Sequence, residues 1–140
     1  REVAGRLLAG PGTRAYGSLT VLHRLVVEVE KALTLEPQCF FPVPKVRSSF
    51  LRMRPLAKPL LLAEELSWVE PVVRAAFAQR RKTLVNALRG SALEPAPDAE
   101  AVVRVLDALG IDRRARAESL DEEQLLSVAR ALAPSGRGPA

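Results

Sequence analysis

The sequence predicts an α/β chain in which helices precede and follow a pair of strands. Three observations predict this class. Apolar residues recur at helical spacing near the start, two central segments alternate apolar and polar side chains, and the remainder again has helical spacing. Because two strands alone form a marginal sheet, we expect them to belong to a larger sheet. The chain opens inside a helical pattern at Arg1, without Met, so we interpret it as a fragment whose upstream part is missing.

The first 54 residues are expected to hold two helices and two strands. Gly10-Pro11-Gly12 breaks the first helical pattern, since proline cannot continue a helix. Ser18 is the expected N-cap of the second helix. Two prolines stiffen the loop between the strands. The expected ranges are 2–9 and 18–26 for the helices, and 27–36 and 46–53 for the strands.

After residue 54 only helices are expected. Pro71 marks a first turn or a kink of a helix over about 64–78. Asp98 should cap a helix that ends at Gly110, and Ser119 with Glu122 matches a capping box for the last helix. A further helical pattern covers 81–89. The predicted organisation is an incomplete domain over 1–54, a Pro-rich linker over 55–62, and a helical domain over 63–140 with a flexible tail from about 134.

Composition excludes several classes of protein. The 140 residues are 48% hydrophobic, which is enough for a core, and 4% aromatic, which excludes a surface built from many stacking rings. A single cysteine and a single histidine exclude a disulfide framework and a Cys/His zinc site. We expect Cys39 to be a small buried hydrophobe and His23 a helical histidine without a catalytic role. No apolar run approaches the roughly 18 residues of a membrane span, so we expect a reducing, cytoplasmic location without membrane contact.

Charge and motifs leave three stretches that could carry chemistry. The net charge of +5 is modest, and it is distributed as +5 over 1–54, +2 over 55–97 and −2 over 98–140. Residues 13–17 hold a Tyr-Gly pair that could be a loop with a packed ring. Phe40 and Phe41, before the stiff loop, are either core residues or a rigid stacking platform.

The third stretch is basic. If 72–89 formed one helix, four cations would lie within about 100° of arc beside an apolar face. Aligned cations on an anchored helix suit a phosphate backbone, and the alternative is a solvated helix face. The four cations are Arg74, Arg81, Lys82 and Arg89.

Six motifs occur together in one order along the chain. In that order they resemble the C-terminal half of the bacterial small-subunit rRNA adenine N6,N6-dimethyltransferases, over residues 1 to about 133. The motifs are Arg1–Ala4 with Arg6-Leu7, Ala15-Tyr16-Gly17, Leu19-Thr20-Val21, Phe40–Ser48, Phe77 with Arg80–Leu84 and Asn86, and Gly110-Ile111-Asp112 with Arg116-Ala117-Glu118.

The resemblance implies a fold and a reaction. The fold is the C-terminal remnant of a Rossmann-like class I methyltransferase sheet followed by a small helical domain. The reaction uses S-adenosylmethionine to dimethylate N6 of two adjacent adenosines near the 3′ end of small-subunit rRNA. The implied partner of this monomeric enzyme is the immature small ribosomal subunit.

The resemblance also implies roles for individual residues. Phe40 occupies the position whose ring stacks on the target adenine, and Phe41 has a packing or helper role. Lys45 contacts phosphate or anchors its loop. Arg47 departs from the family, where an acidic residue is expected. The implied RNA-docking residues are Arg80, Arg81 and Lys82, with Arg116 as a second basic position.

The family's cofactor motifs are absent from these 140 residues. The glycine-rich loop, the acidic residue for the ribose and the Asn-Leu-Pro-Tyr-type motif would lie upstream, so we expect the missing N-terminal part to bind S-adenosylmethionine and this fragment alone to be inactive. Two alternatives stay open: a non-catalytic nucleic-acid-binding module, and a methylase of large-subunit rRNA. The segment from Gly110 to Glu118 argues against the second, because it resembles the small-subunit family.

Overall fold

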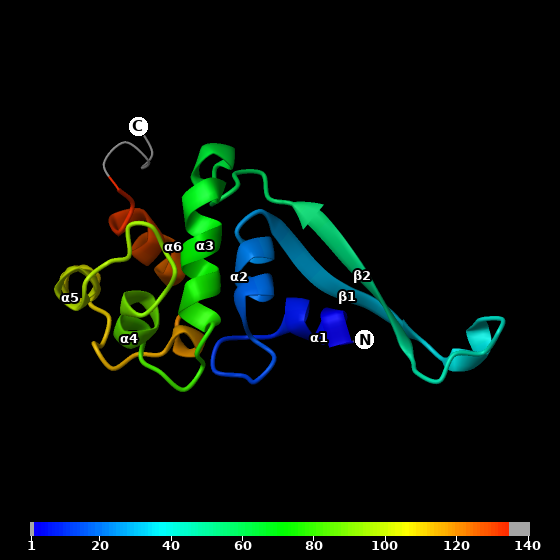
Figure 1. Cartoon of the computed structure of the whole chain (residues 1–140). Helices are drawn as coiled ribbons and strands as arrows, with labels where there is room; N and C mark the ends of the chain where they lie inside the picture. Colours follow the sequence, from blue (N-terminus) through cyan, green and yellow to red (C-terminus); the bar gives the residue numbers. More distant parts are fainter. Residues whose placement is uncertain (1, 135–140) are drawn as a thin grey trace.

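A computed structural model describes residues 2–134 of the chain (Figure 1). It confirms the predicted α/β class, with helices before and after one strand pair. None of the helices in this range is long and apolar enough to cross a membrane. The elements are α1 (Glu2–Leu8), α2 (Ser18–Arg24), β1 (Val27–Leu35), η1 (Pro37–Cys39), β2 (Ser48–Pro55), η2 (Ala63–Glu65), α3 (Leu66–Phe77), α4 (Leu84–Arg89), α5 (Ala99–Ala108), η3 (Ala117–Ser119) and α6 (Glu122–Ala131).

The two strands form an antiparallel hairpin that projects away from the helices (Figure 1). The register runs from Val27 opposite Pro55 to Leu35 opposite Ser48, with an irregularity between Lys31 and Leu33. Every residue of both strands is exposed or half-buried. The described residues contain this one two-stranded sheet, so the expected larger sheet stays a prediction.

One hydrophobic core joins the helices on both sides of the hairpin. The central helix α3 contacts α2, α4 and α6. Leu25, at the end of α2, is fully buried, and its carbonyl accepts a 2.8 Å hydrogen bond from the backbone of Leu60 after β2. The segment 55–62 is therefore fastened to α2, and whether it separates two domains stays a prediction.

Two predicted helix caps are wrong. The N-cap of α2 is Gly17, because the Thr20 hydroxyl accepts from the Gly17 backbone and Ser18 is already helical. The N-cap of α6 is Asp121, whose carboxylate accepts from the Gln124 backbone at 2.8 Å while the Gln124 side chain accepts from the Asp121 backbone at 3.0 Å. A carboxylate two residues closer to the helix replaces Ser119 as the cap.

Among the other helix boundaries, one predicted cap is confirmed, and one of the two roles predicted for Pro71 is excluded. Asp98 caps α5 by accepting from the Ala101 backbone at 2.7 Å, and Gly110 follows that helix with a φ of 69°. Pro71 lies inside α3 rather than in its first turn. The predicted flexible tail falls mostly on residues 135–140, outside the described residues.

The assumption of one helix over 72–89 is also wrong. The chain leaves helical geometry after Phe77, and a new helix begins at Leu84. Thr83 caps it by accepting a hydrogen bond from the backbone of Asn86 at 3.4 Å. The basic residues of this region therefore lie on two helices and the turn between them.

Candidate nucleic-acid interface

Three segments that are distant in sequence meet at Tyr16. Its side chain is fully buried, and its hydroxyl donates a 2.7 Å hydrogen bond to the carbonyl of Leu120. The Phe77 ring packs edge-on against it, with 5.7 Å between ring centroids and 75° between planes. Burial raises the pKa of the Tyr16 phenol, and the nearby carboxylates of Glu122 and Asp121 act in the same direction. The neutral phenol thus stays a donor, and the interpretation of residues 13–17 as a loop with a packed ring is confirmed.

Arg80 makes the second contact between these segments. Its guanidinium donates to the carbonyl of Arg14 at 2.5 Å and to the carbonyls of Thr13 and Tyr16 at 3.4 Å. It also forms a 3.1 Å ion pair with the Glu118 carboxylate. Sequence reasoning assigned Arg80 to RNA docking, and the structure places its guanidinium among four acceptors of the protein itself.

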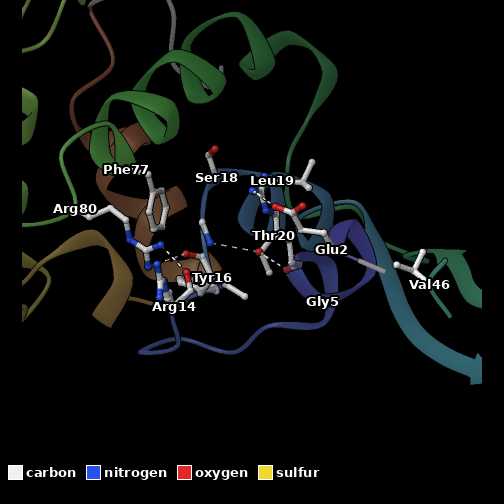
Figure 2. A pocket seen from close by; sticks show the side chains of 13 residues that line it. Glu2, Gly5, Arg14, Tyr16, Ser18, Leu19, Thr20, Val46, Phe77 and Arg80 are labelled. Carbon is white, nitrogen blue, oxygen red and sulfur yellow. Dashed lines mark hydrogen bonds and ion pairs between the residues drawn. The ribbon is translucent and has the colours of Figure 1, made fainter. Parts of the chain in front are cut away.

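An open pocket of about 1050 Å³ lies beside this contact (Figure 2). Its walls come from α1, from residues 14–20, and from Phe77 and Arg80. Val46 adds an apolar wall from the hairpin loop that carries Phe40. Three arginines, Arg6, Arg14 and Arg80, line the pocket, but Arg6 pairs with Glu2 of the same lining and Arg80 pairs with Glu118.

A cationic surface lies where the turn between α3 and α4 meets the segment before η3. The Leu84 backbone donates a 2.8 Å hydrogen bond to the carbonyl of Ala115, which brings these two segments side by side. The side chains flanking this bond are exposed, and within residues 2–134 none of them forms an ion pair. We call this surface the basic junction; its residues are Arg81, Lys82, Arg114 and Arg116.

The sequence did not point to Arg114, and it predicted a single row of four cations that the structure divides between two helices and the turn between them. Arg114 lies two positions before Arg116, and that adjacency was the available signal. Arg74 forms a 2.8 Å ion pair with Glu70 on α3, and Arg89 is exposed at the end of α4. Because α3 and α4 are separate helices, these two arginines do not continue the junction along one helical face.

The hairpin loop presents aromatic and basic side chains. Phe40 is 37% exposed and Phe41 is 99% exposed, so in this chain Phe41 packs on nothing. Lys45 is also exposed. Arg47, the departure from the family, forms a 3.0 Å ion pair with Glu36 across the base of the loop. Cys39 is exposed, which corrects the expectation of a buried thiol.

The buried acid of the described residues is held in an ion pair. The buried acid in residues 2–134 is Glu65, and Arg130 occupies both of its oxygens at 2.7 and 2.9 Å. This contact lowers the pKa of Glu65, with the Leu62 backbone amide contributing, so the carboxylate is committed to a structural ion pair. Residues 2–134 hold no cluster of three or more His, Cys, Asp or Glu side chains suited to a metal ion.

Comparison with known families and sequences gives a consistent result. Residues 1–133 match the family described as ribosomal RNA adenine dimethylase. The chain is 42% identical over 134 residues to ribosomal RNA small subunit methyltransferase A of Geobacillus thermodenitrificans, covering 96% of this chain and 46% of that protein. The corresponding protein of Geobacter sulfurreducens is 40% identical over 136 residues, covering 97% and 49%. The chain therefore spans about half the length of these relatives.

Two solved structures are also similar. A dimethyladenosine transferase from Plasmodium falciparum matches with a TM-score of 0.78 and 26% identity, over 91% of this chain and 52% of that one. The 23S rRNA methyltransferase ErmE matches with a TM-score of 0.55 and 28% identity, over 84% of this chain and 46% of that one.

Proposed function

Since the chain belongs to the ribosomal RNA adenine dimethylase family, we propose that it is the C-terminal half of a small-subunit rRNA adenine dimethyltransferase. The complete enzyme would transfer methyl groups from S-adenosylmethionine to N6 of two adjacent adenosines near the rRNA 3′ end. It would act as a cytoplasmic monomer on immature small subunits. The observation that carries this proposal is the family match over residues 1–133.

In this proposal the parts of the chain have distinct origins. Residues 1–54 are the last part of a Rossmann-like methyltransferase sheet, 55–62 are a linker, and 63–140 are the helical RNA-binding domain. The exposed faces of the hairpin support this division, because strands inside a sheet need neighbours on both sides.

Phe40 supplies a surface for the target base. The adenine amine is a poor nucleophile because its lone pair is delocalised into the ring, so the base must be held out of its stack in a fixed orientation. Unstacked RNA bases are held on aromatic side chains, each worth roughly 1–3 kcal/mol. The partial exposure of Phe40 on a proline-stiffened loop supports this role. Lys45, in the same loop, is available for a neighbouring phosphate.

The basic junction supplies RNA docking. Its side chains are exposed and lack acidic partners within residues 2–134, so their charge is available to phosphates. Arg89, exposed at the end of α4, and Arg74, which is paired with Glu70 on α3, are proposed as separate RNA contacts outside the junction. Reversing Arg81 and Lys82 to Glu should weaken rRNA binding and lower its salt slope by about 2, without changing cofactor affinity. An unchanged slope would mean that the surface is only solvated.

Cofactor binding belongs to the other half of the enzyme. We infer that these 140 residues alone neither bind S-adenosylmethionine nor methylate RNA, because the family's cofactor motifs do not occur among them. Calorimetry should detect no heat of binding between the cofactor and the 140-residue chain. Micromolar binding would contradict this assignment.

The choice of substrate is tested by methyl transfer. The complete protein should modify immature small subunits and leave free large-subunit rRNA unmodified. The relatives named ribosomal RNA small subunit methyltransferase A, at 42% and 40% identity, support that choice. Modification of large-subunit rRNA alone would make the protein a methylase of that RNA, and no transfer to either RNA would favour a non-catalytic binding module.

A further inference from the structure

We propose that Arg80 is a positioning residue, not an RNA contact: it fastens the wall of the pocket to the RNA-docking helices and so sets where the target base is presented. This inference rests on the proposed function for its catalytic consequence. Its structural part, the fastening itself, stands on the contacts of Arg80 alone.

Arg80 donates most of its guanidinium hydrogen bonds to the protein itself. Four acceptors surround it: three backbone carbonyls of residues 13–16 and the Glu118 carboxylate. An arginine has five N–H donors, so most of its capacity is used inside the protein. The Arg80 side chain is 42% exposed, so a phosphate could approach it, but it would meet a cation that is already paired with Glu118. The next residue, Arg81, has no such partner within the described chain, although both belong to the same basic run.

Arg80 joins the turn after α3 to the loop over 12–16 and to Glu118. Glu118 not only pairs with Arg80 but also accepts a 2.6 Å hydrogen bond at its backbone carbonyl from the amide of Gly12. The buried Tyr16 hydroxyl reaches Leu120 two residues further on. The loop over 12–16 is thus fastened at three points, and Arg80 is the one that also belongs to the turn of the basic junction.

Past Tyr16 the loop continues as the wall of the pocket (Figure 2). The Gly17 amide donates to the Thr20 hydroxyl at 3.3 Å, and that hydroxyl donates to the Arg6 carbonyl of α1 at 2.5 Å. The opposite wall is Val46, from the loop of Phe40. Hydrogen bonds therefore connect the docking turn to α1, and Val46 of the stacking loop lines the same pocket as α1.

These contacts predict a separation between binding and turnover. Without Arg80, RNA still finds the basic junction, but the pocket wall shifts relative to the stacking loop. A misplacement of about 1 Å can lower a rate by about 100-fold. We therefore expect loss of Arg80 to act on kcat and loss of Arg81 to act on RNA affinity.

The test uses four variants of the complete protein: Arg80→Ala, Glu118→Gln, Glu118→Ala and the matched control Arg81→Ala. Arg80→Ala should lower kcat at saturating small-subunit RNA by about tenfold or more, with the RNA Kd within about twofold and the salt slope unchanged. Glu118→Ala should lower kcat in the same way, and Glu118→Gln, which keeps a hydrogen-bond acceptor, should restore part of it. Arg81→Ala should weaken Kd and reduce the salt slope by about 1 with little change in kcat.

A second readout needs neither RNA nor cofactor. The Tyr16 amide donates to the Thr13 carbonyl, one of the acceptors of Arg80. Its hydrogen exchange should accelerate about tenfold or more in Arg80→Ala and Glu118→Ala, and not in Arg81→Ala. If the wild-type protein transfers no methyl group, the proposed function fails while this exchange still decides whether Arg80 fastens the loop.

Two results would overturn the inference. One is a salt slope reduced in Arg80→Ala as much as in Arg81→Ala, which would make Arg80 a phosphate contact. The other is an unchanged exchange rate at Tyr16 in both the Arg80→Ala and Glu118→Ala variants. If Arg80→Ala does not fold, the two Glu118 variants carry the same comparison, since removing an acid from an RNA contact would strengthen binding rather than slow turnover.

Discussion

The hairpin and the helical region of this chain use apolar residues in different ways. In the helices over 66–131, apolar side chains pack into one core, and Leu106 is fully buried. In the hairpin over 27–55, Leu33 and Phe50 stay 47% and 56% exposed, and the strands are held by their backbone ladder and by Arg52 and Arg54 paired with Glu30. Apolar patterning thus builds the core in one region and only the local conformation in the other.

The largest expected effect separates the two regions directly. Leu106→Ala should lower the free energy of unfolding by about 2–5 kcal/mol, because it opens a cavity in a packed core. Leu33→Ala, the matched truncation in the hairpin, should change it by about 0.5 kcal/mol or less. Denaturant unfolding of both variants checks the difference. Equal losses would mean that the hairpin is as much a part of the folded core as the helices.

The ion pair between Glu65 and Arg130 should have the next largest effect. Arg130→Met leaves a carboxylate that is 3% exposed without its partner, and should cost about 2 kcal/mol, less than for a fully buried pair because the arginine is 35% exposed. Arg130 lowers the pKa of Glu65, so this stabilisation is present above the ordinary glutamate value of 4.5 and is lost as pH falls through the lower folded value.

The pH profile of unfolding therefore tests this ion pair. The stability difference between the wild type and Glu65→Gln should be constant above pH 4.5 and shrink at lower pH. A difference that grows as pH falls would contradict the assigned direction of the Glu65 pKa.

A smaller effect is expected at the contact of Tyr16. Tyr16→Phe keeps the ring against Phe77 but leaves the Leu120 carbonyl without its donor, which should cost about 1 kcal/mol. Thermal unfolding measures the loss. The Tyr16 hydroxyl lies at the fastened loop and not at the basic junction, so the salt slope of RNA binding should not change in this variant. A reduced slope would mean that the Tyr16 contact also affects the basic junction.

Local patterns predicted most of the fold. The alternation in the hairpin, the Asp98 cap and the glycine after α5 each depend on neighbouring residues, and the structure confirms them. The structure confirms the separate helices predicted over about 64–78 and 81–89, as Leu66–Phe77 and Leu84–Arg89. The part that failed is the conditional single helix over 72–89, because the Thr83 cap begins a new helix.

Contacts between residues far apart in the sequence could not be predicted from local patterns. The Tyr16 hydroxyl reaches across 104 positions to Leu120, and Arg80 reaches across 66 positions to Arg14. Sequence periodicity does not predict pairs so far apart, so the sequence alone did not distinguish Arg80 from the other cations of the basic run. Arg81 and Lys82 are exposed in the structure, so their charges are accessible to solvent, as the sequence predicted.

The most direct test of the proposed function is turnover with the stacking ring removed. The measurement is the amount of N6,N6-dimethyladenosine that the complete protein forms in small-subunit rRNA, together with the RNA Kd, for Phe40→Ala and for Phe41→Ala as the neighbouring control. Phe40→Ala should lower kcat by about tenfold or more with little change in Kd, since stacking is worth roughly 1–3 kcal/mol, and Phe41→Ala should change both only slightly. Equal losses of turnover and binding in Phe40→Ala, or a larger loss of turnover in Phe41→Ala, would contradict the assignment of Phe40 as the surface for the target base.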